Sequence, residues 1–164
     1  MPLEIERKFK IKILDFDNFL KDANKVIEVS QTYLKSSSTL ETRRVRKSTV
    51  YGKSTYYFTH KKDITSYVRE ENEKEISLLE YNSFLEEAIT PTLSKTRYCI
   101  NYDKYMLEID IYPFWKDFAI LEIENLKKGE LFNIPKYIEI IEEVTEDKSY
   151  SNFEIANHLS TLLN

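Results

Sequence analysis

The stretch EIERKF at residues 4–9 shows a pattern that recurs along most of this chain. Successive side chains of a β-strand point to opposite faces, so the two glutamates and Lys8 would share one face. The isoleucine and the phenylalanine would share the other face, with Arg7 between them. The alternation predicts a strand with one charged face and one mostly apolar face.

Further segments rich in Ile, Val, Tyr, Phe and Thr show the same period-two alternation. They lie at about residues 3–12, 26–35, 40–47, 54–62, 66–77, 93–101, 105–112 and 117–125. The short connections between them indicate antiparallel pairing, and this many strands in a small chain tend to close into a barrel or sandwich. We therefore expect roughly eight strands in one antiparallel sheet.

Three helices are expected beside the strands. Apolar side chains at helical spacing predict short helices over residues 15–23 and 78–89. Residues 152–163 repeat Phe, Ala and Leu at the same spacing, and Ser151 or Asn152 could cap the start of this helix. The expected fold class is α+β, with flanking helices and a C-terminal helix docked on the sheet.

Composition excludes several classes of function. With 164 residues, 41% of them hydrophobic, residues 1–164 are expected to form one globular domain. The chain has only two glycines and no glycine-rich phosphate loop, so side chains must hold any phosphate. The net charge of -4 argues against nonspecific nucleic-acid binding.

The cysteine, histidine and hydropathy patterns exclude further kinds of site and location. One cysteine and two distant histidines predict neither an internal disulfide nor a zinc site. The first residues, MPLEIERKF, lack the apolar core of a signal peptide, and no segment is apolar for the length of a membrane helix. A cytoplasmic protein that binds no membrane is expected.

Charged side chains of both signs share strand faces in most of the predicted strands. These sets are Glu4, Glu6 and Lys8; Arg44 and Arg46; Tyr57, Thr59 and Lys61; Arg69, Glu71, Glu73 and Glu75; Lys95 and Arg97; Glu108 and Asp110; Glu122 and Glu124. In any single strand, a solvated face with cross-strand ion pairs would explain such a set.

Six or more strands with this pattern require a further explanation. Glu-x-Glu doublets place like charges side by side, which costs stability unless cations neutralise them. Carboxylate clusters without His or Cys suit Mg²⁺ or Mn²⁺. The Arg-x-Arg and Lys-x-Arg faces suit the oxygens of a polyphosphate. A barrel that closes with this face inward would bring both kinds of group into one lumen.

The same residues resemble a known family. EIERK is similar to the Glu-x-Glu-x-Lys signature of the CYTH domain, the fold of the triphosphate tunnel metalloenzymes. The motifs that follow in the family's order are QTYL (31–34), RVR (44–46), FTHK (58–61), REENEKEI (69–76), KTRY (95–98), EID (108–110), EIE (122–124) and EEVTEDKSYSN (142–152). The last motif resembles the short bacterial branch of this family.

The resemblance implies an eight-stranded antiparallel β-barrel that binds a triphosphate and divalent metals. The implied phosphate ligands are Lys8, Arg44, Arg46, Lys61, Lys95 and Arg97. The implied metal ligands are Glu4, Glu6 and a subset of Glu71, Glu73, Glu75, Glu108, Asp110, Glu122 and Glu124. Lys62 is an alternative to Lys61, and Tyr33 with Lys95 resembles a general acid-base pair, although Lys95 could equally hold phosphate alone.

The implied activity is Mg²⁺- or Mn²⁺-dependent hydrolysis of a triphosphate, with inorganic triphosphate cleaved to diphosphate and phosphate. The alternatives are a thiamine triphosphatase, a class IV type adenylate cyclase and a noncatalytic binder of polyphosphate or nucleotide. The His-Phe-Arg signature of the cyclases is not found, since His60 is followed by Lys61. The expected partner is a small-molecule triphosphate, and the expected assembly is a monomer or homodimer.

Overall fold

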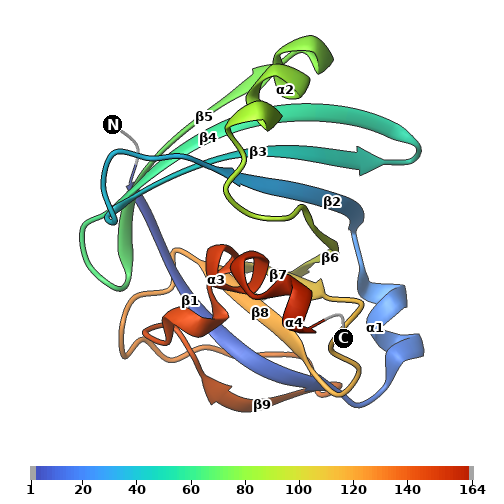
Figure 1. The fold of residues 1–164 in the computed structure, drawn as a ribbon. Helices are drawn as coiled ribbons and strands as arrows, with labels where there is room; N and C mark the ends of the chain where they lie inside the picture. Colours follow the sequence, from blue (N-terminus) through green and yellow to red (C-terminus); the bar gives the residue numbers. More distant parts are fainter. Residues whose placement is uncertain (1–2, 163–164) are drawn as a thin grey trace.

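The computed structural model describes residues 3–162, which form nine strands, four short α-helices and two 3-10 turns (Figure 1). The strands are β1 (Leu3–Ile13), β2 (Lys25–Leu34), β3 (Glu41–Val50), β4 (Lys53–Asp63), β5 (Val68–Ile76), β6 (Leu93–Tyr102), β7 (Tyr105–Ile111), β8 (Ala119–Glu124) and β9 (Ile138–Glu143). The helices are α1 (Phe16–Asp22), α2 (Leu78–Phe84), α3 (Asn152–Asn157) and α4 (Leu159–Leu162), and the turns are η1 (Leu85–Glu87) and η2 (Lys148–Tyr150). No helix among the described residues is long and apolar enough to cross a membrane.

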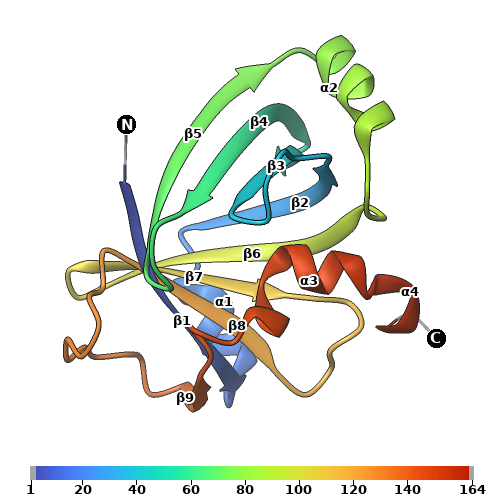
Figure 2. The same ribbon diagram turned by 60° about the vertical axis from the view of Figure 1, so that its left-hand side comes forward.

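Eight of the strands form a closed antiparallel barrel, as predicted. Their order is β5-β4-β3-β2-β6-β7-β8-β1, and the barrel closes where Leu3–Ile5 of β1 pair with residues 68–70 of β5. In Figure 2, β5, β4, β3 and β2 arch over one side of the barrel, while β7, β8 and β1 form the opposite side. The α+β class with flanking helices and a C-terminal helix is confirmed.

A ninth strand, β9, was not predicted. It pairs with residues 9–13 of β1 outside the barrel, and a register shift lies between Lys10 and Ile11. Arg7, on the outer face of β1, donates two hydrogen bonds to the carboxylate of Glu143, at 2.8 and 2.9 Å. This contact fixes the start of the C-terminal segment beside the barrel.

The main apolar core lies outside the barrel wall, because the barrel interior is charged. Outward-facing side chains of β1, β6, β7 and β8 are covered by α1 and by residues 126–140. Phe19 of α1 is fully buried against Tyr98, with ring centroids 4.9 Å apart. Burying such a ring contributes roughly 1.5–3 kcal/mol. The apolar half of the alternation thus stabilises the barrel from outside and leaves its lumen to polar groups.

A second apolar layer covers the outer face of β3, β4 and β5. It comes from α2, which begins with a capping box formed by Ser77 and Glu80. Tyr81 of this helix packs on Tyr56 of β4, with ring centroids 5.0 Å apart. The helix predicted over residues 78–89 is therefore present but ends earlier, as α2 followed by η1.

The predicted C-terminal helix is divided in two at His158, which has φ -101° and ψ 13°. In α3, Ile155 and Ala156 are buried and belong to an apolar cluster that includes Tyr33 of β2 and Tyr112 after β7. This packing docks α3 against the barrel, as Figures 1 and 2 show. Residue 163, the last one predicted for the C-terminal helix, lies outside the described residues.

Candidate active site

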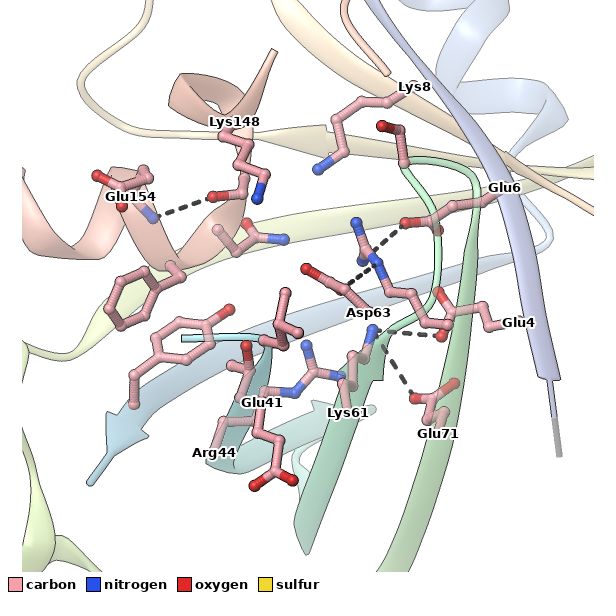
Figure 3. A pocket seen from close by; sticks show the side chains of 18 of the residues that line it. Glu4, Glu6, Lys8, Glu41, Arg44, Lys61, Asp63, Glu71, Lys148 and Glu154 are labelled. Atoms are coloured by element: carbon pink, nitrogen blue, oxygen red, sulfur yellow. Dashed lines mark hydrogen bonds and ion pairs between the residues drawn. The ribbon is translucent and has the colours of Figure 1, made fainter. Parts of the chain in front are cut away.

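The barrel interior contains a cavity of about 1040 Å³ lined mostly by charged and hydroxyl side chains (Figure 3). The strand register places the predicted sets of charged residues on this inner face. Lys61 lies opposite Glu71, Arg97 opposite Asp110 and Lys8 opposite Glu122. Strand parity in the sequence therefore placed these six side chains on the same face of the barrel wall.

Three carboxylates meet at one side of the cavity. Glu4, Glu6 and Glu124 have carboxylate oxygens that all lie within 4.8 Å of one another. Burial, followed by the charges of Glu122 and Glu4, raises the pKa of Glu6 to about 8. Partial burial and the neighbouring Glu108 raise the pKa of the more exposed Glu124 to about 8 as well. Burial and then the neighbouring carboxylates thus make it costly to ionise the whole acidic cluster.

Two cations partly neutralise the acidic cluster. Lys61 Nζ lies 3.3 Å from Glu4 Oε2 and 3.9 Å from Glu71 Oε1. Arg69 lies 3.3 Å from Glu6 and 3.4 Å from Asp63. Figure 3 shows Lys61 between Glu4 and Glu71. Despite these partners, burial raises the pKa of Glu4 too, so Lys61 and Arg69 do not fully offset the cost of ionising the cluster.

The acidic cluster fits a divalent cation. Its donors are carboxylate oxygens, the ligand type that Mg²⁺ and Mn²⁺ prefer. Glu4 Oε2 is buried and makes no hydrogen bond to the described residues, although Lys61 lies at ion-pair distance. Glu108 Oε1, beside the cluster, is also buried without a hydrogen bond from them. A cation bound here would meet oxygens that protein donors leave unsatisfied.

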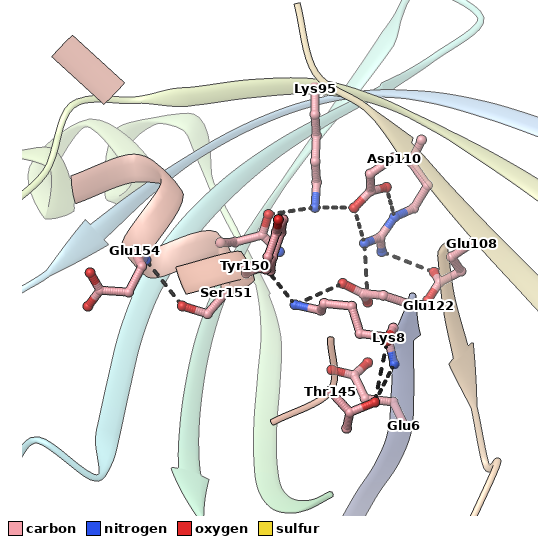
Figure 4. Close-up of polar contacts among 12 residues, drawn as sticks. Glu6, Lys8, Lys95, Glu108, Asp110, Glu122, Thr145, Tyr150, Ser151 and Glu154 are labelled. Carbon is pink, nitrogen blue, oxygen red and sulfur yellow. Dashed lines mark hydrogen bonds and ion pairs between the residues drawn. The ribbon is translucent and has the colours of Figure 1, made fainter. Parts of the chain in front are cut away.

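The remaining inward acids of β7 and β8 are engaged by cations (Figure 4). Asp110 lies 2.6 Å from Lys95 Nζ and 2.8 Å from Arg97 Nε. Glu122 lies 3.6 Å from Lys8 Nζ and 3.7 Å from Arg97. Burial opposes ionisation, but the neighbouring cations hold the pKa of Asp110 below its usual range. Asp110 and Glu122 therefore already have counter-ions inside the barrel.

A cationic wall lies on β3, on another side of the cavity. Within the part of the chain that the structure describes, Arg44 and Arg46 form no ion pair with a carboxylate. Arg44 Nε is buried and donates no hydrogen bond to those residues. Arg46 is held by Gln31 Oε1, at 2.9 and 3.1 Å, and burial lowers its pKa to about 10. Two arginines without an anion are suited to bind one.

Tyr33 and Lys95, the predicted acid-base pair, occupy different surroundings. Tyr33 lines the cavity, and its hydroxyl accepts a hydrogen bond from Gln31 Nε2 at 3.1 Å. Lys95 has a side chain with 0% exposure and lies behind the cavity wall against Asp110. Burial, reinforced by Arg97 and Arg46 and opposed by Asp110, lowers the pKa of Lys95 to about 7. The structure records no direct contact between the two among the described residues.

The other predicted residues are placed as follows. Glu73 lines the cavity and accepts a hydrogen bond from Thr59 at 2.9 Å. Glu75 shares its strand face but is exposed and lies outside the cavity lining. Lys61 points into the cavity, whereas Lys62, one residue along β4, is exposed and does not line it.

Several cavity residues were not among the predicted ligands. Strand parity placed Arg69 on the charged face of β5, but no ligand role was predicted for it. Thr145, Lys148 and Asn152 come from the loop and turn after β9 and from α3. Only the resemblance of the motif at residues 142–152 pointed to this segment, because no strand or helix periodicity shows which of its side chains face the lumen.

Comparisons with known proteins bear on the fold. No protein-family model matches the chain, and no curated protein matches it. Among solved structures, the inorganic triphosphatase NE1496 is 24% identical, with a TM-score of 0.58 over 95% of each chain. PH1819 from Pyrococcus horikoshii OT3 is 21% identical, with a TM-score of 0.59 over 77% of this chain and 81% of that one. This chain has the triphosphate tunnel fold.

A third structure adds a different description. HpAC1 from Hippeastrum, described as a putative adenylyl cyclase with a dominant triphosphatase activity, is 13% identical to this chain. Its TM-score is 0.53 over 76% of this chain and 81% of that one. The triphosphate tunnel fold is thus found in proteins described by two different activities, so the activity of this chain has to be argued from its own side chains.

Proposed function

We propose that this protein hydrolyses a triphosphate in the barrel cavity with the help of Mg²⁺ or Mn²⁺. The observation that carries the proposal is the division of charge in the cavity wall. The three carboxyl groups of the acidic cluster face the two cations Lys61 and Arg69, while Arg44 and Arg46 pair with no carboxylate among the described residues. A metal-bound triphosphate complements both sides.

Glu4, Glu6 and Glu124 are the residues that would hold the metal, with Glu108 beside them. A divalent cation held there would supply positive charge for phosphate oxygens and would make a nearby water molecule a better nucleophile. The chain's own contribution is to keep the three carboxylates together despite their repulsion, because β1 and β8 fix Glu6 opposite Glu124 in register.

The cationic side chains would bind and orient the phosphate chain. Arg44 and Arg46 can donate hydrogen bonds directly to phosphate oxygens, since no carboxylate competes for them among the described residues. Lys8, Lys61 and Arg97 would shift from their carboxylate partners toward the substrate. Fixed cations of this kind stabilise the charge that develops on a transferring phosphoryl group.

Tyr33 and Lys95 are the proposed proton-handling residues. Because Gln31 donates to the Tyr33 oxygen, the hydroxyl hydrogen of Tyr33 stays available to a group in the cavity. A lysine with a pKa of about 7 can exchange a proton near neutral pH. Its burial against Asp110 also permits a second role, in which Lys95 only holds the inner wall together.

Inorganic triphosphate is the proposed preferred substrate. Two aromatic side chains line the described part of the cavity, Tyr33 and Phe153, and they pack edge to face at 88° with centroids 5.4 Å apart. Because the two rings are not parallel, they form no sandwich in which a nucleobase could stack between two ring faces. The description of NE1496 as an inorganic triphosphatase supports the same preference.

Adenylate cyclase activity is the second candidate, supported by the description of HpAC1 as a putative adenylyl cyclase. Thiamine triphosphate hydrolysis and noncatalytic binding are further alternatives. A phosphate-release screen separates them: tripolyphosphate, thiamine triphosphate and ATP are tested with Mg²⁺, Mn²⁺ and Ca²⁺, and the ATP products are separated by chromatography. We expect tripolyphosphate to be cleaved with the highest kcat/KM in Mg²⁺ or Mn²⁺. Cyclic AMP as the main product would refute the hydrolase assignment.

A further inference from the structure

Asn152, the first residue of α3, lies where the C-terminal helix meets the cavity. Its Oδ1 accepts a short hydrogen bond from the Tyr112 hydroxyl and another from Lys95 Nζ at 3.3 Å. Tyr112 and Lys95 are both buried, so two donors from the barrel wall converge on one amide oxygen.

These two contacts fix the orientation of the amide. A lysine ammonium has three donors and no acceptor, so the amide atom that faces it must be the oxygen and not the nitrogen. With Oδ1 occupied, the amide nitrogen Nδ2 points away from Lys95. Asn152 lines the cavity, and no described residue accepts a hydrogen bond from Nδ2.

The backbone around Asn152 is also fixed. Ser151 caps α3 by accepting a hydrogen bond from the Glu154 amide at 3.2 Å. Ile155 and Ala156, three and four residues further along the helix, are buried on the same face as Asn152. The amide therefore projects from an anchored turn, which limits the conformational entropy lost when a ligand binds.

We propose that Asn152 is a further substrate-binding residue, which donates a hydrogen bond from Nδ2 to a phosphate oxygen of the triphosphate. The inference rests on the proposed function, since it requires a phosphate chain in the cavity. It gives the C-terminal segment a direct part in recognition. Unlike Lys8, Lys61 and Arg97, the neutral amide has no carboxylate partner to give up before it binds phosphate.

The test is Asn152→Asp, with Asn157→Asp as the matched control. Aspartate has the same shape and keeps an oxygen for Tyr112 and Lys95, but replaces the Nδ2 donors with an acceptor that repels phosphate. Asn157 lies on the same helix, is exposed and does not line the cavity. Binding of tripolyphosphate is measured by calorimetry in excess chelator, so that no metal contributes, and KM and kcat are then measured with Mg²⁺.

We expect Asn152→Asp to raise the Kd for tripolyphosphate and KM by about tenfold or more, as for a hydrogen bond to a charged group. Asn157→Asp should stay within about twofold of the wild type in both. An unchanged Kd and KM in a folded Asn152→Asp protein, with only its melting temperature lowered, would show a structural role and overturn the proposal. If Asn152→Asp does not fold, Asn152→Ser, which also removes the amide donors, is measured in the same way and with the same criteria.

The wild-type protein separates this inference from the proposed function. If it cleaves tripolyphosphate and the Asn152 variants bind it normally, only the role of Asn152 is refuted. If it binds tripolyphosphate without cleaving it, hydrolysis is refuted while the calorimetric comparison still decides on Asn152. If it neither binds nor cleaves it, both proposals are wrong.

Discussion

The acidic cluster makes a prediction about stability without metal. Glu6 is buried, and its pKa is raised from 4.5 to about 8 by burial and by Glu122 and Glu4. Between these two values the folded protein binds a proton that the unfolded chain has released. Its contribution to stability is therefore fully present below pH 4.5 and is lost as the pH rises through about 8.

The size of the effect follows from the shift. Each unit of pKa difference corresponds to about 1.4 kcal/mol, so ionising Glu6 could cost up to about 5 kcal/mol. Glu4 and Glu124 titrate together with Glu6, and relaxation of the cluster would reduce the loss of unfolding free energy to a few kcal/mol. That loss is on the order of a third of the stability of a small domain. Glu6→Gln removes this titration but keeps the shape of the side chain.

Urea unfolding in excess chelator at pH 5, 6.5 and 8 measures the difference. We expect the wild type to lose a few kcal/mol relative to Glu6→Gln as the pH rises, and Mg²⁺ to restore much of the loss in the wild type alone. Glu86→Gln, which changes an exposed acid of η1 outside the cavity lining, should follow the wild type. Parallel pH curves for wild type and Glu6→Gln would refute the charge crowding.

Three further changes test other parts of the site. Arg44→Ala should raise KM for tripolyphosphate about 10- to 100-fold, because it removes charge-assisted hydrogen bonds to phosphate. Arg43 lies on the outer face beside Glu87, so Arg43→Ala should leave KM unchanged. Equal effects of the two substitutions on KM would argue against the inward cationic wall. Lys95→Ala should lower kcat about 100-fold or more with a smaller change in KM if Lys95 transfers protons, whereas a lower melting temperature with normal kcat would indicate the structural role. Truncation after residue 145 removes α3 from the apolar cluster at Tyr33, so it should lower the melting temperature by several degrees and abolish turnover; a truncated protein that melts and turns over normally would show that α3 is dispensable.

The sequence predicted the barrel and its lumen well because strand parity is a local property. In EIERK the side chain of every second residue faces the same side, and in the closed barrel the charged faces of paired strands point the same way. β9 was missed because IEIIEE at residues 138–143 alternates only in its first half. Its position depends on the free edge of β1, which periodicity does not reveal.

The grouping of charges inside the lumen depends on register, which the sequence does not show. Glu108, Asp110, Glu122 and Glu124 looked alike in the chain, yet Asp110 lies against Lys95 and Arg97 while Glu124 meets Glu4 and Glu6. The first contact lies within the β6–β7 hairpin, whereas Glu124 lies opposite Glu6 across β8 and β1, which are far apart in the sequence. The inward side chains after β9 belong to an irregular segment whose orientation is set by tertiary contacts such as Arg7 with Glu143.

The most direct test of the account is phosphate release from tripolyphosphate with Mg²⁺, measured for the wild type, for Glu6→Ala and for the wild type in excess chelator. If the acidic cluster holds a catalytic metal beside a bound triphosphate, the wild type turns over, Glu6→Ala is slower by orders of magnitude, and chelator abolishes activity until Mg²⁺ or Mn²⁺ is added back. Full activity in excess chelator, or in Glu6→Ala, would contradict the central claim.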